Sequence, residues 1–198
     1  SFARIIVTAA SVADTALVVV RRPTRIHVDN ERVGSQQFGT FARPFATIAL
    51  GIAATQPGDT VIVADGTPYV EAVAIGSGIT LVGDSAAYLA TGRDPSRLPV
   101  LAPPAGSTAI GITSGLTVVR HLAIQNAVDG TAVVALGADV TLSDLFVNPG
   151  LASGARGAGI LVEGAPSAAR VDSVRVESVR GYGVRIVNSV DARVARSI

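Results

Sequence analysis

The fold is decided by four short apolar blocks in the second half of the chain: Ala-Ile-Gly-Ile (109–112), Ala-Val-Val-Ala (132–135), Gly-Ile-Leu-Val (159–162) and Gly-Val-Arg-Ile (183–186). Their second residues are separated by 23, 27 and 24 residues. A second series runs in step with them at residues 119–122, 142–145, 171–174 and, less regularly, 194–197. Two strand-sized motifs that recur together every two dozen residues predict a solenoid, in which each copy is one coil.

Stacking coil on coil predicts which side chains point inward. One interior column contains Ile110, Val133, Ile160 and Val184, and the next contains Ile112, Ala135, Val162 and Ile186. Because side chains alternate along a strand, the outward residues are Gly111, Val134, Leu161 and Arg185, with Thr113, Leu136, Glu163 and Val187 beside them. This outward face is mostly aliphatic, so we expect the N-terminal strands, a further domain or a second copy of the chain to pack on it.

The composition allows a large interior and excludes several classes of function. Apolar residues make up 48% of the chain and charged residues 16%, and 21 glycines supply turns at the coil corners. All 16 basic residues are arginines, the net charge is +1, and the arginines are scattered among acids, which argues against nucleic-acid binding. With no cysteine there is no disulfide, thiolate metal site or cysteine nucleophile.

Residues 1–24 are predicted to be a separate N-terminal segment. Two short strands, Ala3–Thr8 and Ala16–Arg21, would form a hairpin or a lead-in from a further domain. Residues 5–20 are the most apolar stretch, but Asp14 interrupts them, so no membrane span is predicted. The chain has no methionine and its last block stops partway through a coil, so we expect a processed end or fragment at Ser1 and a solenoid that continues beyond residue 198.

A short helix is predicted over residues 44–55, at the start of a solenoid domain that spans residues 25–198. Five apolar residues follow helical spacing, namely Phe45, Ile48, Ala49, Ile52 and Ala53. Pro44 or Thr47 would begin the helix, and Pro57-Gly58 would end it. An open solenoid end exposes strand backbone and core, so we expect this helix to cap the first coil.

The segments around this helix carry a family resemblance. In order, they are Pro44-Phe-Ala-Thr-Ile, Pro57-Gly-Asp-Thr-Val, Asp65-Gly-Thr-Pro-Tyr-Val-Glu and Ile79-Thr-Leu-Val-Gly-Asp. Together they resemble the N-terminal cap and first coils of proteins of the pectin-lyase-like superfamily, with Pro68 as a small departure. The resemblance implies an all-β fold, a right-handed single-stranded parallel β-helix with a capping helix, and a secreted or cell-surface location. The superfamily includes lyases, hydrolases, esterases and non-catalytic surface proteins, so it does not select an activity.

Catalytic residues are not predicted. Cleavage of a sugar chain needs paired carboxylates, or acids that hold a cation. The outward face offers one acid, Glu163, and one arginine, Arg185, and the signature motifs of polygalacturonases, pectin methylesterases and pectate lyases are missing from the sequence.

One corner of the solenoid carries polar residues on successive coils. The register places His121 over Asp144 over Ser173, with coils about 4.8 Å apart. A catalytic relay needs the histidine in the middle, so this order predicts a polar ladder instead. Asp144 and Asp172 could share Ca²⁺, although two carboxylates are few for that ion. Asp65, Glu71 and Asp84 lie in turns, where we expect them to accept hydrogen bonds from backbone amides.

Two insertions interrupt the repeats, at Asp84–Pro99 and Asn148–Gly157. Such loops collect on the binding side of solenoids. The candidate binding residues are those of the two loops and the two charged residues of the outward face: Tyr88, Arg93, Asp94, Arg97, Arg156, Glu163 and Arg185.

The sequence therefore predicts a non-catalytic extracellular or cell-surface module. It would be a structural scaffold or an adhesin-like binding protein that assembles through its apolar face or binds a polysaccharide. The alternative is the N-terminal part of a lyase or hydrolase that acts on an acidic polysaccharide, with its active residues beyond residue 198.

Overall fold

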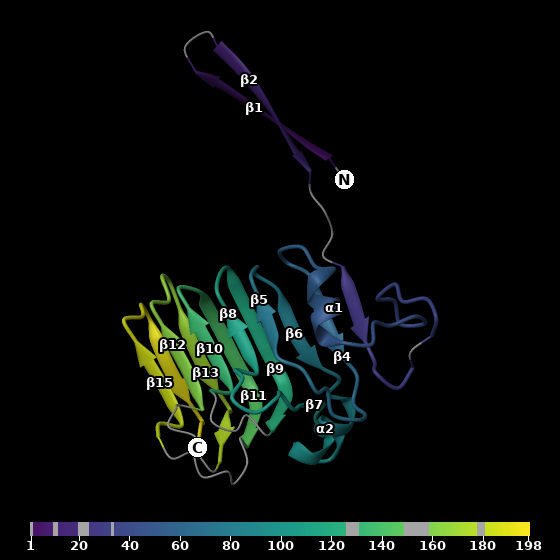
Figure 1. The fold of residues 1–198 in the computed structure, drawn as a ribbon. Helices are drawn as coiled ribbons and strands as arrows, with labels where there is room; N and C mark the ends of the chain where they lie inside the picture. The colour runs from purple at the N-terminus through teal and green to yellow at the C-terminus, as the bar shows by residue number, and fades with distance from the viewer. Residues whose placement is uncertain are drawn as a thin grey trace.

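The structure is a computed structural model that describes residues 2–9, 12–19, 24–32, 34–125, 131–148, 159–177 and 181–198. The fold is all-β, with two parallel sheets, one antiparallel pair and a few short helices (Figure 1). In this described part of the chain, no helix is long and apolar enough to cross a membrane.

The N-terminal segment forms a hairpin, as one of the two predictions for it stated. Strand β1 (Phe2–Ala9) pairs antiparallel with β2 (Val12–Val19), and the register runs from Phe2 opposite Val19 to Ala9 opposite Val12. The second strand begins earlier than the predicted Ala16, because the backbone ladder continues through Asp14 and Thr15. The division of the chain at residues 24 and 25 stays a prediction.

The first parallel sheet contains the four repeated apolar blocks. Its strands are β5 (Val73–Ile75), β8 (Ile110–Ile112), β10 (Val133–Leu136), β12 (Ile160–Glu163) and β15 (Val184–Val187), in the order β15-β12-β10-β8-β5. The register aligns Val133 with Ile110 and Ile160, and Ile160 with Val184, which confirms the predicted interior columns. Val184 is half-buried, because β15 is the edge strand of this sheet.

The second parallel sheet alternates with the first along the chain. Its strands are β3 (Arg25–Val28), β4 (Thr60–Val63), β6 (Thr80–Gly83), β9 (Leu116–Gln125), β11 (Asp139–Asn148), β13 (Ala169–Asp172) and β16 (Ala192–Ala195), in the order β16-β13-β11-β9-β6-β4-β3. From β8 onward, each strand of the first sheet is followed by one or more strands of the second. This alternation repeats with each apolar block.

Strands β9 and β11 each turn a corner at a single residue. His121 and Asp144 have positive φ angles of 55° and 49°, and Ser173 and Arg196 have the same conformation at 53° and 46° in the next two repeats. Beyond the corner the strands pair again, now with the short strands β7 (Val100–Leu101) and β14 (Arg175–Val176). The predicted polar ladder therefore exists, and it marks the line along which the second sheet bends.

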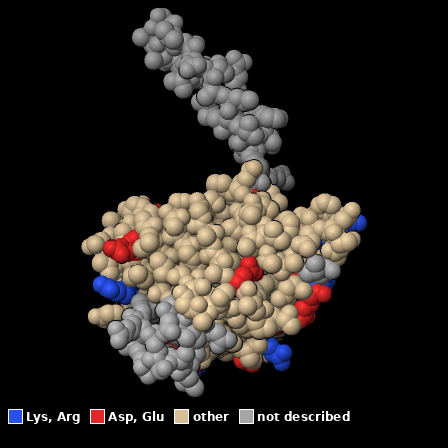
Figure 2. Space-filling view, viewed as in Figure 1, with Lys and Arg blue, Asp and Glu red and all other residues tan. Residues whose placement is uncertain are grey.

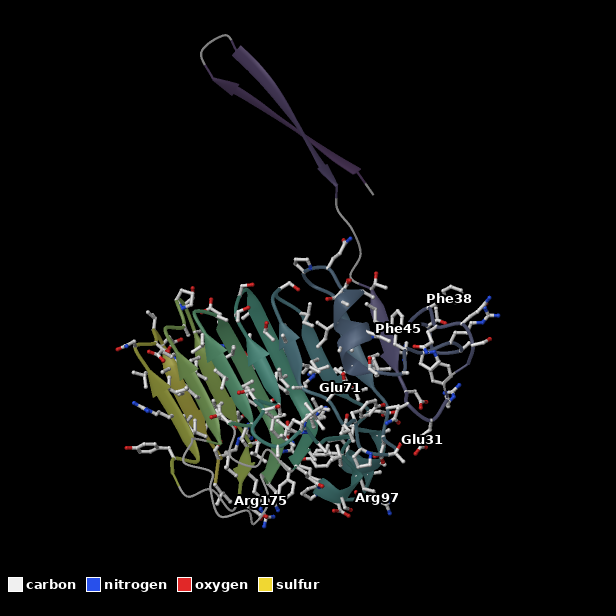
Figure 3. All side chains as sticks on the ribbon, viewed as in Figure 1. Glu31, Phe38, Phe45, Glu71, Arg97 and Arg175 are labelled. Atoms are coloured by element: carbon white, nitrogen blue, oxygen red, sulfur yellow. The ribbon has the colours of Figure 1, made fainter. Side chains whose placement is uncertain are left out.

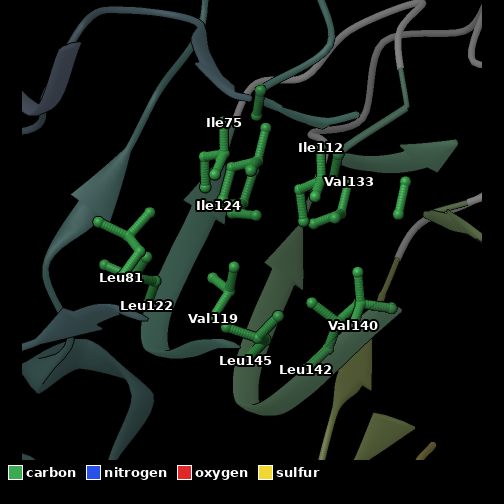
Figure 4. Close-up of a cluster of buried hydrophobic side chains, with 14 of the residues drawn as sticks. Ile75, Leu81, Ile112, Val119, Leu122, Ile124, Val133, Val140, Leu142 and Leu145 are labelled. Carbon is green, nitrogen blue, oxygen red and sulfur yellow. The ribbon is translucent and has the colours of Figure 1, made fainter. Parts of the chain in front are cut away.

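The hydrophobic core lies between these faces and continues from repeat to repeat (Figure 4). Leu81, Val119, Leu142 and Val171 stand in register and are at most 1% exposed. Full burial of each such side chain contributes about 1.5–3 kcal/mol. Stacked aliphatic columns are therefore the main source of stability.

Helix α1 (Ile48–Ala53) is shorter than the predicted 44–55. The residues before it extend the sheet instead, because the amide of Phe45 donates to the carbonyl of His27 and the amide of Asp29 donates to the carbonyl of Phe45. Thr47 is the N-cap, and its hydroxyl accepts from the amide of Leu50 at 3.1 Å.

The buried side of α1 also differs from the prediction. Ile48 and Gly51 are buried and Ile52 packs against the core, whereas Ala49 and Ala53 are exposed. The helix contacts β3, β4 and β5 at the first end of the sheets, where the predicted cap belongs. Gly51 is required there, since a Cβ atom would lie 2.6 Å from Cγ2 of Val28.

Candidate functional site

One repeat turns its corner differently from those that follow. Between β6 and β7 the chain makes the predicted insertion of residues 84–99, which contains α2 (Ala86–Ala90) and the short 3₁₀ helix η1 (Pro95–Arg97). The carboxylate of Asp84 accepts from the amide of Ala86 at 3.2 Å. The later repeats make the same corner with one residue of positive φ. The insertion is therefore an addition to the frame, by which we mean the two parallel sheets and the corners between their strands.

The insertion is anchored by a small apolar cluster of its own. Tyr88 and Leu98 are 6% and 1% exposed, and they pack with Ala123 of β9. Val100 and Phe146 complete this cluster. The insertion thus lies on the outward side of strand segments whose other side faces the main core.

A groove of about 330 Å³ opens beside this cluster. We call it the corner groove, and six of the side chains that line it are Tyr88, Arg93, Asp144, Ser173, Arg175 and Arg196. Nη1 of Arg93 lies 2.9 Å from Oδ1 of Asp144, so the insertion is tied to a corner residue two repeats further on. Of the predicted candidates, Tyr88 and Arg93 lie together here.

His121 lies beside two of the groove residues, Asp144 and Tyr88. Its Nε2 atom lies 3.7 Å from Oδ2 of Asp144, and its ring centroid lies 5.8 Å from that of Tyr88. Its Nδ1 atom is buried and has no hydrogen-bond partner in the described part of the chain. Burial lowers the pKa of His121, although the Asp144 carboxylate opposes the shift. Burial, reinforced by Asp144, raises the pKa of Tyr88.

The corner does not form a nucleophilic relay. The Ser173 hydroxyl donates to Asp172 at 3.4 Å, and Asp144 lies between His121 and Ser173 along the ladder, as predicted.

The carboxylates around the groove have arginine partners. Nε of Arg196 lies 2.9 Å from Oδ1 of Asp172, its Nη2 reaches the other oxygen, and these bonds lower the pKa of Asp172. Arg175 pairs with Glu177 and lies over the ring of Phe146, 5.7 Å from its centroid. The two carboxylates considered for Ca²⁺ are thus each bound by a guanidinium group. Within the described ranges, no group of three or more metal-ligating side chains comes together.

The other candidate residues lie elsewhere. Asp94 caps η1, accepting from the amide and the hydroxyl of Ser96, and these bonds lower its pKa. Arg97 is exposed and lies apart from Arg175 (Figure 3). Arg156 falls outside the described residues.

Glu163 and Arg185 belong to the first sheet, away from the groove. Glu163 stands opposite Val187 and Arg185 opposite Leu161, and the Arg185 guanidinium lies 5.7 Å from the centroid of the Tyr182 ring. The predicted aliphatic face is present around them: Val134 and Leu161 are half-buried and Leu136 is 45% exposed. On the side of the molecule shown in Figure 2, charged side chains are few and scattered, and broad uncharged areas lie between them.

Sequence reasoning missed Arg175 and Arg196 as groove residues. A signal for Arg196 was present, because it occupies the same place in its block (194–197) as His121, Asp144 and Ser173 do in theirs. Arg175 gives no such signal, since it follows the block.

Comparisons with known proteins found no matching family model, no matching curated protein and no matching solved structure. The geometry of the corner groove is therefore the main guide to function. Three guanidinium groups, two hydroxyls and one paired carboxylate form a surface suited to a ligand that carries anionic groups.

Proposed function

We propose that this chain is a right-handed parallel β-helix module of the pectin-lyase-like type, exported or displayed at a cell surface. Its function is that of a non-catalytic scaffold that binds an acidic polysaccharide in the corner groove. The parallel register of both sheets and the corner residue of positive φ in four successive repeats support the fold. The resemblance of residues 25–84 supports the family and the location.

The observation that carries the binding role is the convergence of three arginines from separate segments. Arg93 comes from the insertion, Arg175 from β14, and Arg196 directly follows β16. Their side chains are 55%, 58% and 74% exposed, so their present ion pairs are in contact with solvent. Exposed ion pairs contribute little to stability, so a carboxylate of the ligand can replace a protein carboxylate at small cost.

The alternative, a lyase or hydrolase acting on the same kind of polymer, is less well supported. Hydrolysis requires two carboxyl groups on either side of the scissile bond. Asp144 is the acid that lines the groove, and Arg93 holds it at 2.9 Å. Among the described residues that line the groove, Asp144 is the one side-chain carboxylate, so the second carboxyl group that hydrolysis needs is missing there. We therefore favour binding without cleavage.

A binding assay with immobilised polygalacturonate tests this proposal, with neutral dextran as the reference polymer. We expect binding to polygalacturonate that weakens as salt is added. Arg175→Gln should weaken it by about tenfold, the effect of losing one charge-assisted hydrogen bond. Arg97→Gln is the matched control and should bind like the parent chain, because Arg97 is also an exposed arginine but lies outside the groove.

The same samples separate the two functions. Equal binding to both polymers, or equal loss in Arg175→Gln and Arg97→Gln, would contradict a role for the groove. Release of reducing or unsaturated ends from polygalacturonate would show that the chain is an enzyme and would contradict the scaffold function.

A further inference from the structure

A second concave site lies at the other end of the long sheet. A cavity of about 320 Å³ opens between the outward residues of β3 and β4 and the loop that follows β3. We call it the aromatic pocket; its polar and aromatic walls are His27, Asp29, Arg32, Phe41, Asp65 and Asp84. This volume is at the lower end of the range for small-molecule sites.

A tight turn supplies the aromatic wall. The amide of Phe38 donates to the carbonyl of Arg43, and the amide of Arg43 donates back to the carbonyl of Thr40. Gly39 has a φ of 68° within this turn. As a result Phe38 and Phe41 are 60% and 67% exposed (Phe38 is labelled in Figure 3), although only Phe41 lines the pocket.

The Phe41 ring already carries a cation on one side. The Arg32 guanidinium lies 4.8 Å from its centroid, and the His27 ring meets it edge-on at 5.6 Å. This geometry is that of a cation–π contact, which also underlies the recognition of organic ammonium groups. Because most of the ring remains exposed, a second cation can reach it from the pocket.

The carboxylates of the pocket complement such a ligand. Asp29 accepts from the amides of Glu31 and Arg32, and its Oδ2 atom lies 3.8 Å from Nε of Arg32. Asp65 and Asp84 accept only from the amides of Gly66 and Ala86, and no arginine of the described ranges lies within ion-pair distance of either.

The charge of the pocket walls is therefore negative. Burial lowers the pKa of His27 and the positive charge of the nearby Arg25 lowers it further, so its imidazole is neutral at pH 7. The three carboxylates are opposed by Arg32 as the one guanidinium on the walls. A cationic ligand would meet both attraction and an aromatic surface here.

We propose that the aromatic pocket binds the primary ammonium group of a small organic cation of amino-sugar size. The ammonium group lies against Phe41 and donates to the carboxylates of Asp65 and Asp84. An organic cation fits better than a metal ion, because the described residues bring no three metal-ligating side chains together. This site is independent of the corner groove and of the proposed polysaccharide.

Titration with glucosamine, followed by amide chemical shifts, tests the inference, and glucose is the uncharged probe of the same size. We expect saturable shifts around Gly66 and Ala86 with glucosamine, none with glucose, and weaker binding at high salt. The double variant Asp65→Asn/Asp84→Asn should weaken binding by at least about fivefold, since it removes the charges. Asparagine keeps a side-chain oxygen for the two backbone amides, so the turns should stay folded.

The two exposed phenylalanines give a matched pair. Phe41→Ala should weaken glucosamine binding by about two- to fivefold, as expected for an exposed cation–π contact, and Phe38→Ala should leave it unchanged. Equal effects of the two substitutions, equal shifts with glucose, or full binding by the double asparagine variant would each overturn the inference. Arg175→Gln should bind glucosamine normally, which separates this result from the test of the corner groove.

Discussion

The corner groove and the aromatic pocket are built in the same way but differ in how their charges are satisfied. Each forms where the chain leaves the sheets, through residues 84–99 in one case and through the loop after β3 in the other. In the groove, Asp144 is held by Arg93 and the neighbouring Asp172 by Arg196. In the pocket, Asp65 and Asp84 are bound by backbone amides alone.

In the groove, a ligand can exchange with the ion-pair partner of an existing arginine. In the pocket, Asp65 and Asp84 have no such partner among the described residues. A ligand of the groove must displace existing ion pairs, so it gains mainly from presenting several anionic groups at once. A ligand of the pocket meets two carboxylates, Asp65 and Asp84, that have no guanidinium of the described ranges within ion-pair distance, so one ammonium group is sufficient. The repeating frame holds both sites in place, and the two chain excursions determine their chemistry.

The largest effect on this comparison should come from detaching the insertion that forms the groove. Leu98→Ala removes a side chain that is 1% exposed in the cluster with Tyr88 and Ala123, so we expect a loss of about 2–3 kcal/mol in the free energy of unfolding. Urea unfolding provides the measurement. Leu89→Ala, in α2 of the same insertion, is the control, because Leu89 is 52% exposed and its replacement should cost less than about 0.5 kcal/mol. Similar losses in both variants would mean that the cluster does not anchor the insertion.

A smaller effect should distinguish the two regions by pH, because each contains one of the two histidines of the chain. Burial is the largest cause of the lowered pKa at both His27 and His121. Each histidine is therefore neutral in the folded protein at pH 7, while the unfolded chain titrates at about 6.5. Stability is fully present above that value and is lost as the pH falls through the lower folded pKa, because the unfolded state then binds more protons.

The free energy of unfolding should consequently fall between pH 7 and pH 5, in a window above the titration of the aspartates. His27→Gln and His121→Gln should each remove part of this fall, and the double variant should remove most of it. NMR titration of the two imidazoles checks the direction independently. A folded-state pKa above 6.5 at either position would reverse the expected sign there.

The sequence predicted the frame well because the frame is periodic. Aliphatic residues at spacings of 23, 27 and 24 indicated which side chains share a column, and the register of Val133, Ile160 and Val184 confirmed it. The predicted beginning of α1 was wrong because of a tertiary contact. Phe45 pairs with β3, and that pairing competes with helix formation at residues that otherwise have helical spacing.

The two sites were harder to predict because they depend on segments without a period. The Arg93–Asp144 contact joins residues 51 positions apart, and no local pattern indicates where an insertion will fold back. Phe41 gave no signal at all, since its exposure follows from the turn at Gly39. Arg196, in contrast, lies in register with the ladder and could have been placed from spacing alone.

The smallest expected effect concerns the single-residue corners that the insertion replaces in one repeat. Ser173 has a φ of 53°, a conformation that costs a residue with a Cβ atom about 1–2 kcal/mol and glycine much less. Glycine also loses more backbone entropy on folding, about 0.4–1 kcal/mol, so Ser173→Gly should stabilise the protein by about 0.5 kcal/mol. Ser167→Gly, at an exposed position without positive φ, lacks the conformational gain and should destabilise it. Changes of opposite sign in the unfolding midpoints of the two variants would show that the corner stores strain. The insertion at residues 84–99 avoids this strain at its own corner. Equal losses of stability in the two variants would mean that the left-handed corner is not strained. The apolar cluster would then be the main energetic difference between the two kinds of corner.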